Sequence, residues 1–381
     1  MDIKTFEHLH SNYNLEKKFS SKEYNCNNLH VTAWFGLEIQ YILNNLADIN
    51  VISRYSGTAL QTAALRGHKN IVELLLQSGA SVNTQGGCYH TAVQAAAAGG
   101  HKDTIKFLLQ QGAEINVQGG HYGAALQAAA AVGNKDTVEF LIQQGAEINA
   151  QGKNYGTALQ VAAARGHKHV VKYLIQQGAE IDANGGCYGT PLQVAATRGH
   201  KDTVEFLIQQ GAAINAQGSY CGTALQAAAA GGHKDIVEFL IQQNAEINVQ
   251  SKRYGTALQA AVAGGHKDTV AFLIQQSANI NTQSGRYGTA LQAAALWGYK
   301  DIVEFLVQQG AEINAQGGHY GSAIQAAAAW GHRDIVEFLV QQGAQINIQG
   351  GHYGTALQVA AAEGHNDTVK FLIQQGAKIN L

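Results

Sequence analysis

The 381-residue sequence contains little proline and little charge. It has one proline, where average usage of about 5% would give roughly nineteen. Charged residues make up 14% of the chain, against about a quarter in typical domains, while the apolar share of 46% is ordinary. A disordered chain would have fewer apolar residues and a net charge larger than the formal −2 found here. We therefore expect an ordered chain.

Further absences narrow the class of protein. No apolar run reaches the roughly 18 residues that span a bilayer, so we expect no membrane insertion. Lys and Arg total 25 against 27 acids, so the chain lacks the surplus of positive charge that drives bulk nucleic-acid binding. The first 20 residues lack a secretory pattern, and four cysteines are too few to staple a chain of this length. We expect an intracellular protein of the cytoplasm, with the nucleus as the alternative.

What the sequence has instead is a tandem repeat of 33 residues. The segment 155–167 recurs without insertion or deletion over ten units that end at Leu381. A shorter, divergent unit at 25–54 precedes them, and the structure of residues 1–24 is not predicted. One threonine marks the register at positions 58, 91, 157, 190, 223, 256, 289 and 355, with Ala124 and Ser322 in the two remaining units.

Each unit divides into two helices and a connector. The marker threonine predicts the N-cap of an alanine-rich helix A, which a glycine such as Gly67 ends in the left-handed conformation. Helix B follows, with an apolar stripe that in the segment 235–241 includes Ile236, Val237, Phe239, Leu240 and Ile241.

A second glycine ends helix B in most units, but Asn244 and Ser277 replace it. Ser277 tolerates the left-handed conformation poorly, so we expect a weak joint there. Because such a helix pair cannot bury its own apolar surface, stability must come from stacking on the neighbouring units.

The repeat resembles the ankyrin family over residues 25–381, by its period, the Gly-His pair between helices and the Ala-Glu-Ile-Asn-Ala tail. The resemblance implies an all-α solenoid of helix-turn-helix-finger units with a concave groove. The family's Thr-Pro-Leu-His signature appears here as Thr-Ala-Leu-Gln, and most closely at 190–193. A glutamine both donates and accepts, so we expect it to retain the role of the family's histidine in tying units together. The glycine-rich finger is similar to ankyrin arrays of filamentous fungi.

Two slots differ from unit to unit, and the resemblance places both on the groove where partners bind. The finger slot holds Tyr55, Cys88, His121, Asn154, Cys187, Tyr220, Arg253, Arg286, His319 and His352. The helix-A slot holds Arg66, Gly99, Val132, Arg165, Arg198, Gly231, Gly264, Trp297, Trp330 and Glu363. Aromatic and arginine side chains are enriched at binding hot spots. The predicted partner-binding residues are Trp297, Trp330, Arg253, Arg286, His319, His352, Arg165, Arg198, Arg66 and Tyr220.

Other interpretations of these slots stay open. Exposed positions are free to drift, the two tryptophans can pack over the next helix A, and Arg165 and Arg198 can be solvated surface residues or a clamp for a carboxylate or phosphate. Eight units share a finger tyrosine, for which we expect packing of finger against finger. The Gly-His histidines are expected to make hydrogen bonds at the helix turn.

Chemistry at a catalytic or metal site is not predicted. His319 and His352 are expected to lie roughly 10 Å apart, one repeat along the stack, which is too far for two ligands of one zinc ion. No nucleophile, carboxylate pair or phosphate-binding loop stands out, so we expect no catalysis and no cofactor. The leading hypothesis is a monomeric, non-catalytic scaffold that binds a protein partner. The alternative is the ligand-sensing segment of a receptor-like system whose nucleotide-binding switch is carried on another polypeptide or is missing.

Overall fold

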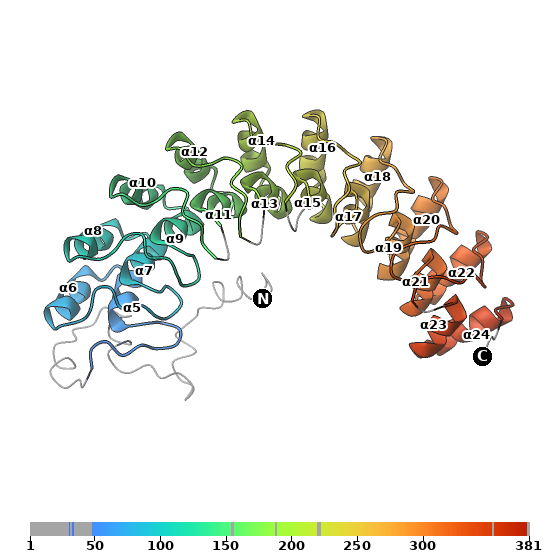
Figure 1. The fold of residues 1–381 in the computed structure, drawn as a ribbon, viewed down its shortest axis with the longest axis horizontal. Helices are drawn as coiled ribbons and strands as arrows, with labels where there is room; N and C mark the ends of the chain where they lie inside the picture. Colours follow the sequence, from blue (N-terminus) through green and yellow to red (C-terminus); the bar gives the residue numbers. More distant parts are fainter. Residues whose placement is uncertain are drawn as a thin grey trace. The chain divides into compact units, whose positions relative to one another are not determined.

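The computed structural model describes residues 30, 33, 48–153, 156–186, 189–218, 222–352 and 354–378, all as paired helices and their connectors (Figure 1). The chain divides into two compact units, Met1–Asn154 and Tyr155–Leu381, which are described separately. The described helices of the first unit are α5 (Ala59–Arg66), α6 (Lys69–Gln77), α7 (Ala92–Gly99), α8 (Lys102–Gln110), α9 (Ala125–Val132) and α10 (Lys135–Gln143). Odd-numbered helices are helix A of each repeat, and even-numbered helices are helix B.

The second unit continues the same alternation. Its described helices are α11 (Ala158–Ala164), α12 (Lys168–Gln176), α13 (Pro191–Arg198), α14 (Lys201–Gln209), α15 (Ala224–Ala230), α16 (Lys234–Gln242), α17 (Ala257–Ala263), α18 (Lys267–Gln275), α19 (Ala290–Trp297), α20 (Lys300–Gln308), α21 (Ala323–Ala329), α22 (Arg333–Gln341), α23 (Ala356–Ala362) and α24 (Asn366–Gln374). The described residues contain no extended strand, only isolated bridges that close each finger, such as Ser251 with Gly255. No helix in the described ranges has the length and apolarity needed to cross a bilayer.

Helix A begins at the predicted cap. In α15 the Thr223 side chain accepts a hydrogen bond from the backbone N–H of Gln226, and the Gln226 side chain accepts one from the Thr223 N–H. Seven other units have the same threonine bond to the third helical residue. Ala124 has no side-chain cap, and the Ser322 hydroxyl binds the Gln325 amide oxygen instead. The predicted cap is therefore missing in two units, at Ala124, which has no hydroxyl, and at Ser322, whose hydroxyl donates to a side chain instead.

Left-handed residues end both helices, as the glycine pattern predicts. Gly67 follows helix A with a φ of 71°, and its counterparts in the other units share this conformation. Asn244 and Ser277 take the glycine's place after helix B, each with a φ of 66°. Because serine has a Cβ atom that makes this region unfavourable, the structure places strain at Ser277.

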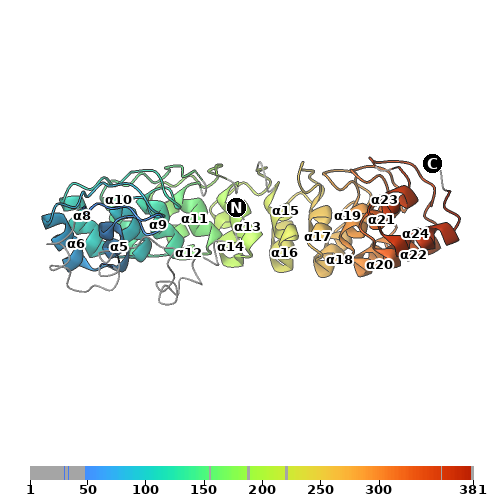
Figure 2. The same ribbon diagram turned by 90° about the horizontal axis from the view of Figure 1, so that it is seen from below.

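The core is shared between successive repeats. Alanines on helix A are almost fully buried, because within each of the two units helix A of one repeat packs against helix A of the next, as α15 does against α17 (Figure 2). On helix B the buried stripe is narrower than predicted: Ile236, Val237 and Leu240 are buried, while Phe239 and Ile241 are half-buried. The phenylalanine at this helix-B position can contact a cation of the preceding repeat. Lys234 Nζ, for example, lies 5.8 Å from the centre of the Phe272 ring in the next repeat.

Candidate interaction surface

A buried glutamine fixes each finger to the repeat before it. Gln226 is 1% exposed and donates its amide N–H groups to the carbonyl oxygens of Val249 and Gly255, each at 2.7 Å. Val249 lies in the connector that follows helix B of the same repeat, and Gly255 lies in the finger of the following repeat. The Gln226 side chain also accepts from Thr223 N–H at 2.8 Å, so one amide joins a helix start to the next finger. The predicted tie between units is confirmed.

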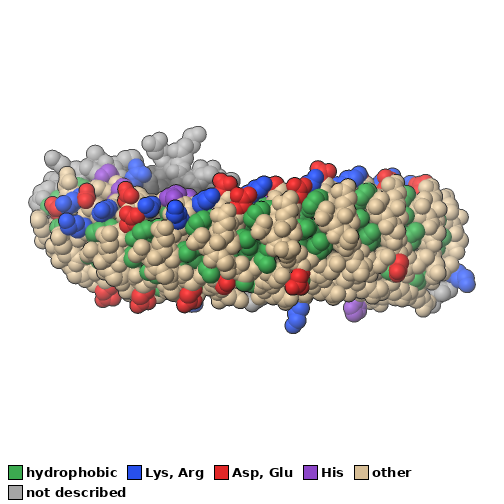
Figure 3. Space-filling model, turned by 90° about the horizontal axis from the view of Figure 1, so that it is seen from above, with side chains coloured by type: hydrophobic (Ala, Val, Ile, Leu, Met, Phe, Trp, Pro, Cys, Tyr) green, Lys and Arg blue, Asp and Glu red, His purple; other side chains and the backbone are tan. Residues whose placement is uncertain are grey.

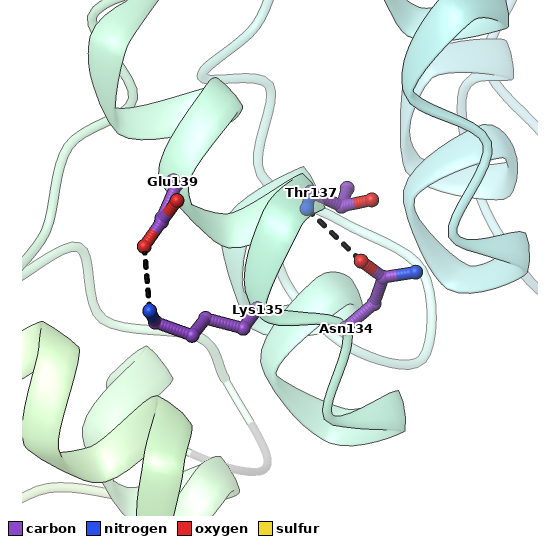
Figure 4. Close-up of polar contacts among 4 residues, drawn as sticks. All are labelled: Asn134, Lys135, Thr137 and Glu139. Atoms are coloured by element: carbon purple, nitrogen blue, oxygen red, sulfur yellow. Dashed lines mark hydrogen bonds and ion pairs between the residues drawn. The ribbon is translucent and has the colours of Figure 1, made fainter.

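The histidine that begins helix B makes a second tie. His266 Nε2 lies 3.1 Å from the carbonyl oxygen of Ala230 in the preceding repeat, and the same bond recurs in five other units. Asn134 occupies this position in one unit and accepts a hydrogen bond from the backbone N–H of Thr137 at 3.0 Å (Figure 4). Its amide nitrogen approaches the Gly100 carbonyl at 3.4 Å. Asparagine therefore retains the contact to the preceding repeat, and the hydrogen-bonding role of these histidines is confirmed.

Neighbouring fingers are also joined directly. The backbone N–H of His352 donates to the carbonyl of His319 at 3.3 Å, and that of His121 donates to Cys88 at 2.9 Å. The rings of His319 and His352 lie 4.7 Å apart between centroids. The expected spacing of roughly 10 Å was wrong, because it used the separation of packed helices whereas the fingers are hydrogen-bonded neighbours. No group of three or more metal-ligating side chains occurs in the part of the chain that is described.

The finger tyrosines pack against other aromatic groups. Tyr89 and Tyr122 stack on successive fingers with ring centroids 6.3 Å apart, so the expected packing of finger against finger is confirmed for this pair. Tyr287 instead meets Trp297 edge-on at 6.2 Å. In the next unit the Trp330 indole N–H donates to the hydroxyl of Tyr320 at 3.2 Å. Each tryptophan thus joins the end of its helix A to the finger that precedes that helix.

Sequence reasoning missed these tyrosine–tryptophan pairs. Each pair spans ten residues, from 287 to 297 and from 320 to 330, and this common spacing was the available signal. Although they contact tyrosine, Trp297 and Trp330 remain 45% and 53% exposed. Both indoles therefore present a large face to solvent, with one edge held in place.

Close packing of the preceding repeat explains why two units have glycine in the helix-A slot. A Cβ atom built on Gly99 would lie 2.2 Å from the Leu65 carbonyl oxygen, and one on Gly264 would lie 2.7 Å from that of Ala230. Both carbonyls belong to the preceding repeat, so these two positions exclude a side chain. Part of the variation in this slot is therefore set by the approach of neighbouring repeats.

The predicted cationic residues lie on the fingers and at the ends of helix A. Arg253 and Arg286 are exposed on successive fingers, and the Arg253 guanidinium lies 5.3 Å from the centre of the Tyr254 ring. Arg66 is exposed at the end of α5 in the first unit. Tyr220 lies outside the described residues.

Arg165 and Arg198 come near one imidazole. Burial is the largest cause that lowers the pKa of His200, and the charges of both arginines lower it further, against the opposing effect of its hydrogen bond to Ala164. Both arginines are half-buried. The structure thus brings together two of the predicted cations in addition to the finger pair.

The family model for ankyrin repeats (3 copies) matches residues 29–119, 125–218, 181–251, 224–317 and 318–381. The chain therefore belongs to the ankyrin-repeat family, and its paired helices form that family's all-α solenoid. No curated protein gives a significant match. Ankyrin repeats generally mediate protein–protein interactions.

Proposed function

We propose that this protein is a non-catalytic scaffold that binds a protein partner with the fingers and helix-A ends of residues 253–363. We call the set Arg253, Arg286, Trp297, His319, Trp330 and His352 the aromatic–cationic surface. The observation that supports it most is the exposure of Trp297 and Trp330, each anchored at one edge by a tyrosine. Indoles held in this way lose little conformational entropy on binding, and tryptophan is enriched at hot spots.

Side-chain contacts join part of this surface across two successive repeats. Trp330 contacts Tyr320, whose ring meets that of His319 at 5.0 Å, and His319 contacts His352 on the next finger. The helix-A end and two fingers thus form a continuous row of aromatic groups. A partner that covers this row would bury aromatic area that a monomer otherwise leaves in water.

Affinity capture with substituted chains tests the proposal. Full-length protein and a Trp297→Ala/Trp330→Ala variant would be used to capture partners from cells of the source organism. As a control, Gln242→Ala/Gln275→Ala changes exposed residues at the ends of α16 and α18. We expect the principal partner to be lost with the tryptophan variant and retained with the control.

The result that contradicts the proposal is a partner list that the tryptophan substitutions leave unchanged. Capture of a nucleotide-binding switch protein through the same residues would instead support the role of a ligand-sensing segment in a receptor-like system. Both variants would be compared with wild type in urea unfolding, so that loss of binding is separated from loss of fold.

A further inference from the structure

Charge is unevenly distributed between the two sides of the repeat. In each repeat a 14-residue segment runs from the finger to the helix-A slot, for example 251–264. The ten segments hold eight of the 25 Lys and Arg residues of the chain but one of its 27 Asp and Glu residues, Glu363. The remaining acids lie outside these segments, in the described repeats on helix B and in the connectors. The surface that holds the exposed tryptophans is therefore the one that lacks carboxylates.

Six lysines on helix B are paired with carboxylates within the protein. In the Tyr155–Leu381 unit, Lys267 Nζ lies 3.4 Å from an Asp301 carboxylate oxygen, and Lys300 Nζ lies 4.0 Å from Glu304. All ion pairs found among the described residues join helix-B side chains. On the face seen in Figure 3, acidic and basic side chains lie interspersed along one edge. The charge of these six lysines is thus balanced locally.

Cations on the fingers lack such partners. Arg253 and Arg286 are exposed on adjacent fingers, and neither forms an ion pair with any described residue. Lys252 adds a third exposed cation beside Arg253. Guanidinium groups bind carboxylates through two parallel hydrogen bonds, and an unpaired cluster on a binding surface favours a partner of opposite charge.

We infer that the partner segment bound at the aromatic–cationic surface is an acidic stretch of polypeptide, with Asp or Glu side chains on Arg253 and Arg286 and an apolar side chain on Trp297 or Trp330. This inference rests on the proposed function and adds the chemistry of the partner. A nucleic acid fits less well. Duplex DNA carries one charge per ~1.7 Å, whereas the fingers of these repeats supply at most two Lys or Arg residues each.

Selection from a random peptide library tests the inference. The immobilised full chain would be used to select 12-residue peptides, and binding of the selected peptides would be measured by fluorescence anisotropy at two salt concentrations. We expect Asp and Glu to be enriched over the starting library, and affinity to fall with salt. Arg253→Gln/Arg286→Gln should weaken binding by about tenfold. The matched control, Lys234→Gln/Lys300→Gln, removes the same charge from helix B and should leave affinity unchanged.

The outcomes separate this inference from the proposed function. Peptides without acidic enrichment that still lose affinity in Trp297→Ala/Trp330→Ala would overturn the acidic partner and leave the scaffold in place. Selected peptides that are insensitive to the tryptophan substitutions would contradict both. An equal loss of peptide affinity in the arginine and lysine variants would overturn the inference of an acidic partner segment. So would a single-stranded oligonucleotide that binds more tightly than the selected peptides and depends on the same two arginines. Charge reversal, Arg253→Glu/Arg286→Glu, should favour lysine-rich peptides if the inference is correct.

Discussion

Replacing one glutamine of the inter-repeat tie should destabilise the chain far more than replacing its counterpart in the last repeat. Gln226→Leu keeps nearly the same volume but removes every hydrogen bond of the amide. The buried Thr223 N–H would lose its partner, the part-buried Val249 carbonyl would lose another, and the Gly255 carbonyl would keep only its bonds from Ser251. Each buried group left unsatisfied costs ~1–3 kcal/mol, so we expect a loss of about 3 kcal/mol in the free energy of unfolding.

The matched control is Gln358→Leu. Gln358 accepts from Thr355 N–H at 2.8 Å, but it lies in the last described repeat and is exposed. One part-buried partner is lost there, which gives about 1 kcal/mol. Urea unfolding followed by circular dichroism measures both variants, and hydrogen exchange at Gly255 reports directly on the released finger. Equal losses in the two variants, or a loss below about 1 kcal/mol for Gln226→Leu, would refute the tie as a source of stability.

Three further changes should alter stability in stated directions. Ala124→Thr supplies the missing cap and should add about 1 kcal/mol to the free energy of unfolding in urea titrations, and no gain would contradict the capping argument. Ser277→Gly relieves a left-handed serine and should raise the urea midpoint by an amount equal to about 1 kcal/mol, whereas an unchanged midpoint would show that the joint is unstrained. Burial lowers the folded-state pKa of His101 and His200. As the pH falls through the unfolded-state pKa of about 6.5, the unfolded chain therefore binds more protons than the folded chain, and the free energy of unfolding decreases as the pH decreases. His101→Asn/His200→Asn, with the residue found at this slot in the third repeat, should flatten the loss between pH 7.5 and 5.5, and an unaltered pH dependence would assign the loss to other groups.

Local rules account for what the sequence predicted correctly. The position of helix A in eight units follows from a threonine hydroxyl at the cap and a glycine that adopts positive φ after the helix, as at Thr223 and Gly67. The glutamine tie was predictable because an amide both donates and accepts, and one occurs at the same position in all ten units. The positive φ of Ser277 also follows from its place in the repeat, where most units have glycine.

Relations between repeats were harder to predict. The contact of His319 with His352 depends on a backbone hydrogen bond between fingers, so the spacing of helices gave the wrong distance. The glycine at position 264 reflects a carbonyl of the preceding repeat, which sequence variation alone cannot distinguish from drift. Comparison of the units placed Trp297 and Trp330 in one slot, but their tyrosine partners came only from the structure.

Hydroxyl-radical footprinting of the partner complex tests the central claim most directly. The full chain would be oxidised with and without a captured partner, and the extent of modification at each side chain read by mass spectrometry. We expect Trp297 and Trp330, which are 45% and 53% exposed in the free chain, to be protected, while Phe239 and Phe272 on helix B change little. Protection confined to the helix-B residues, with both tryptophans oxidised as in the free chain, would contradict the assignment of the binding surface.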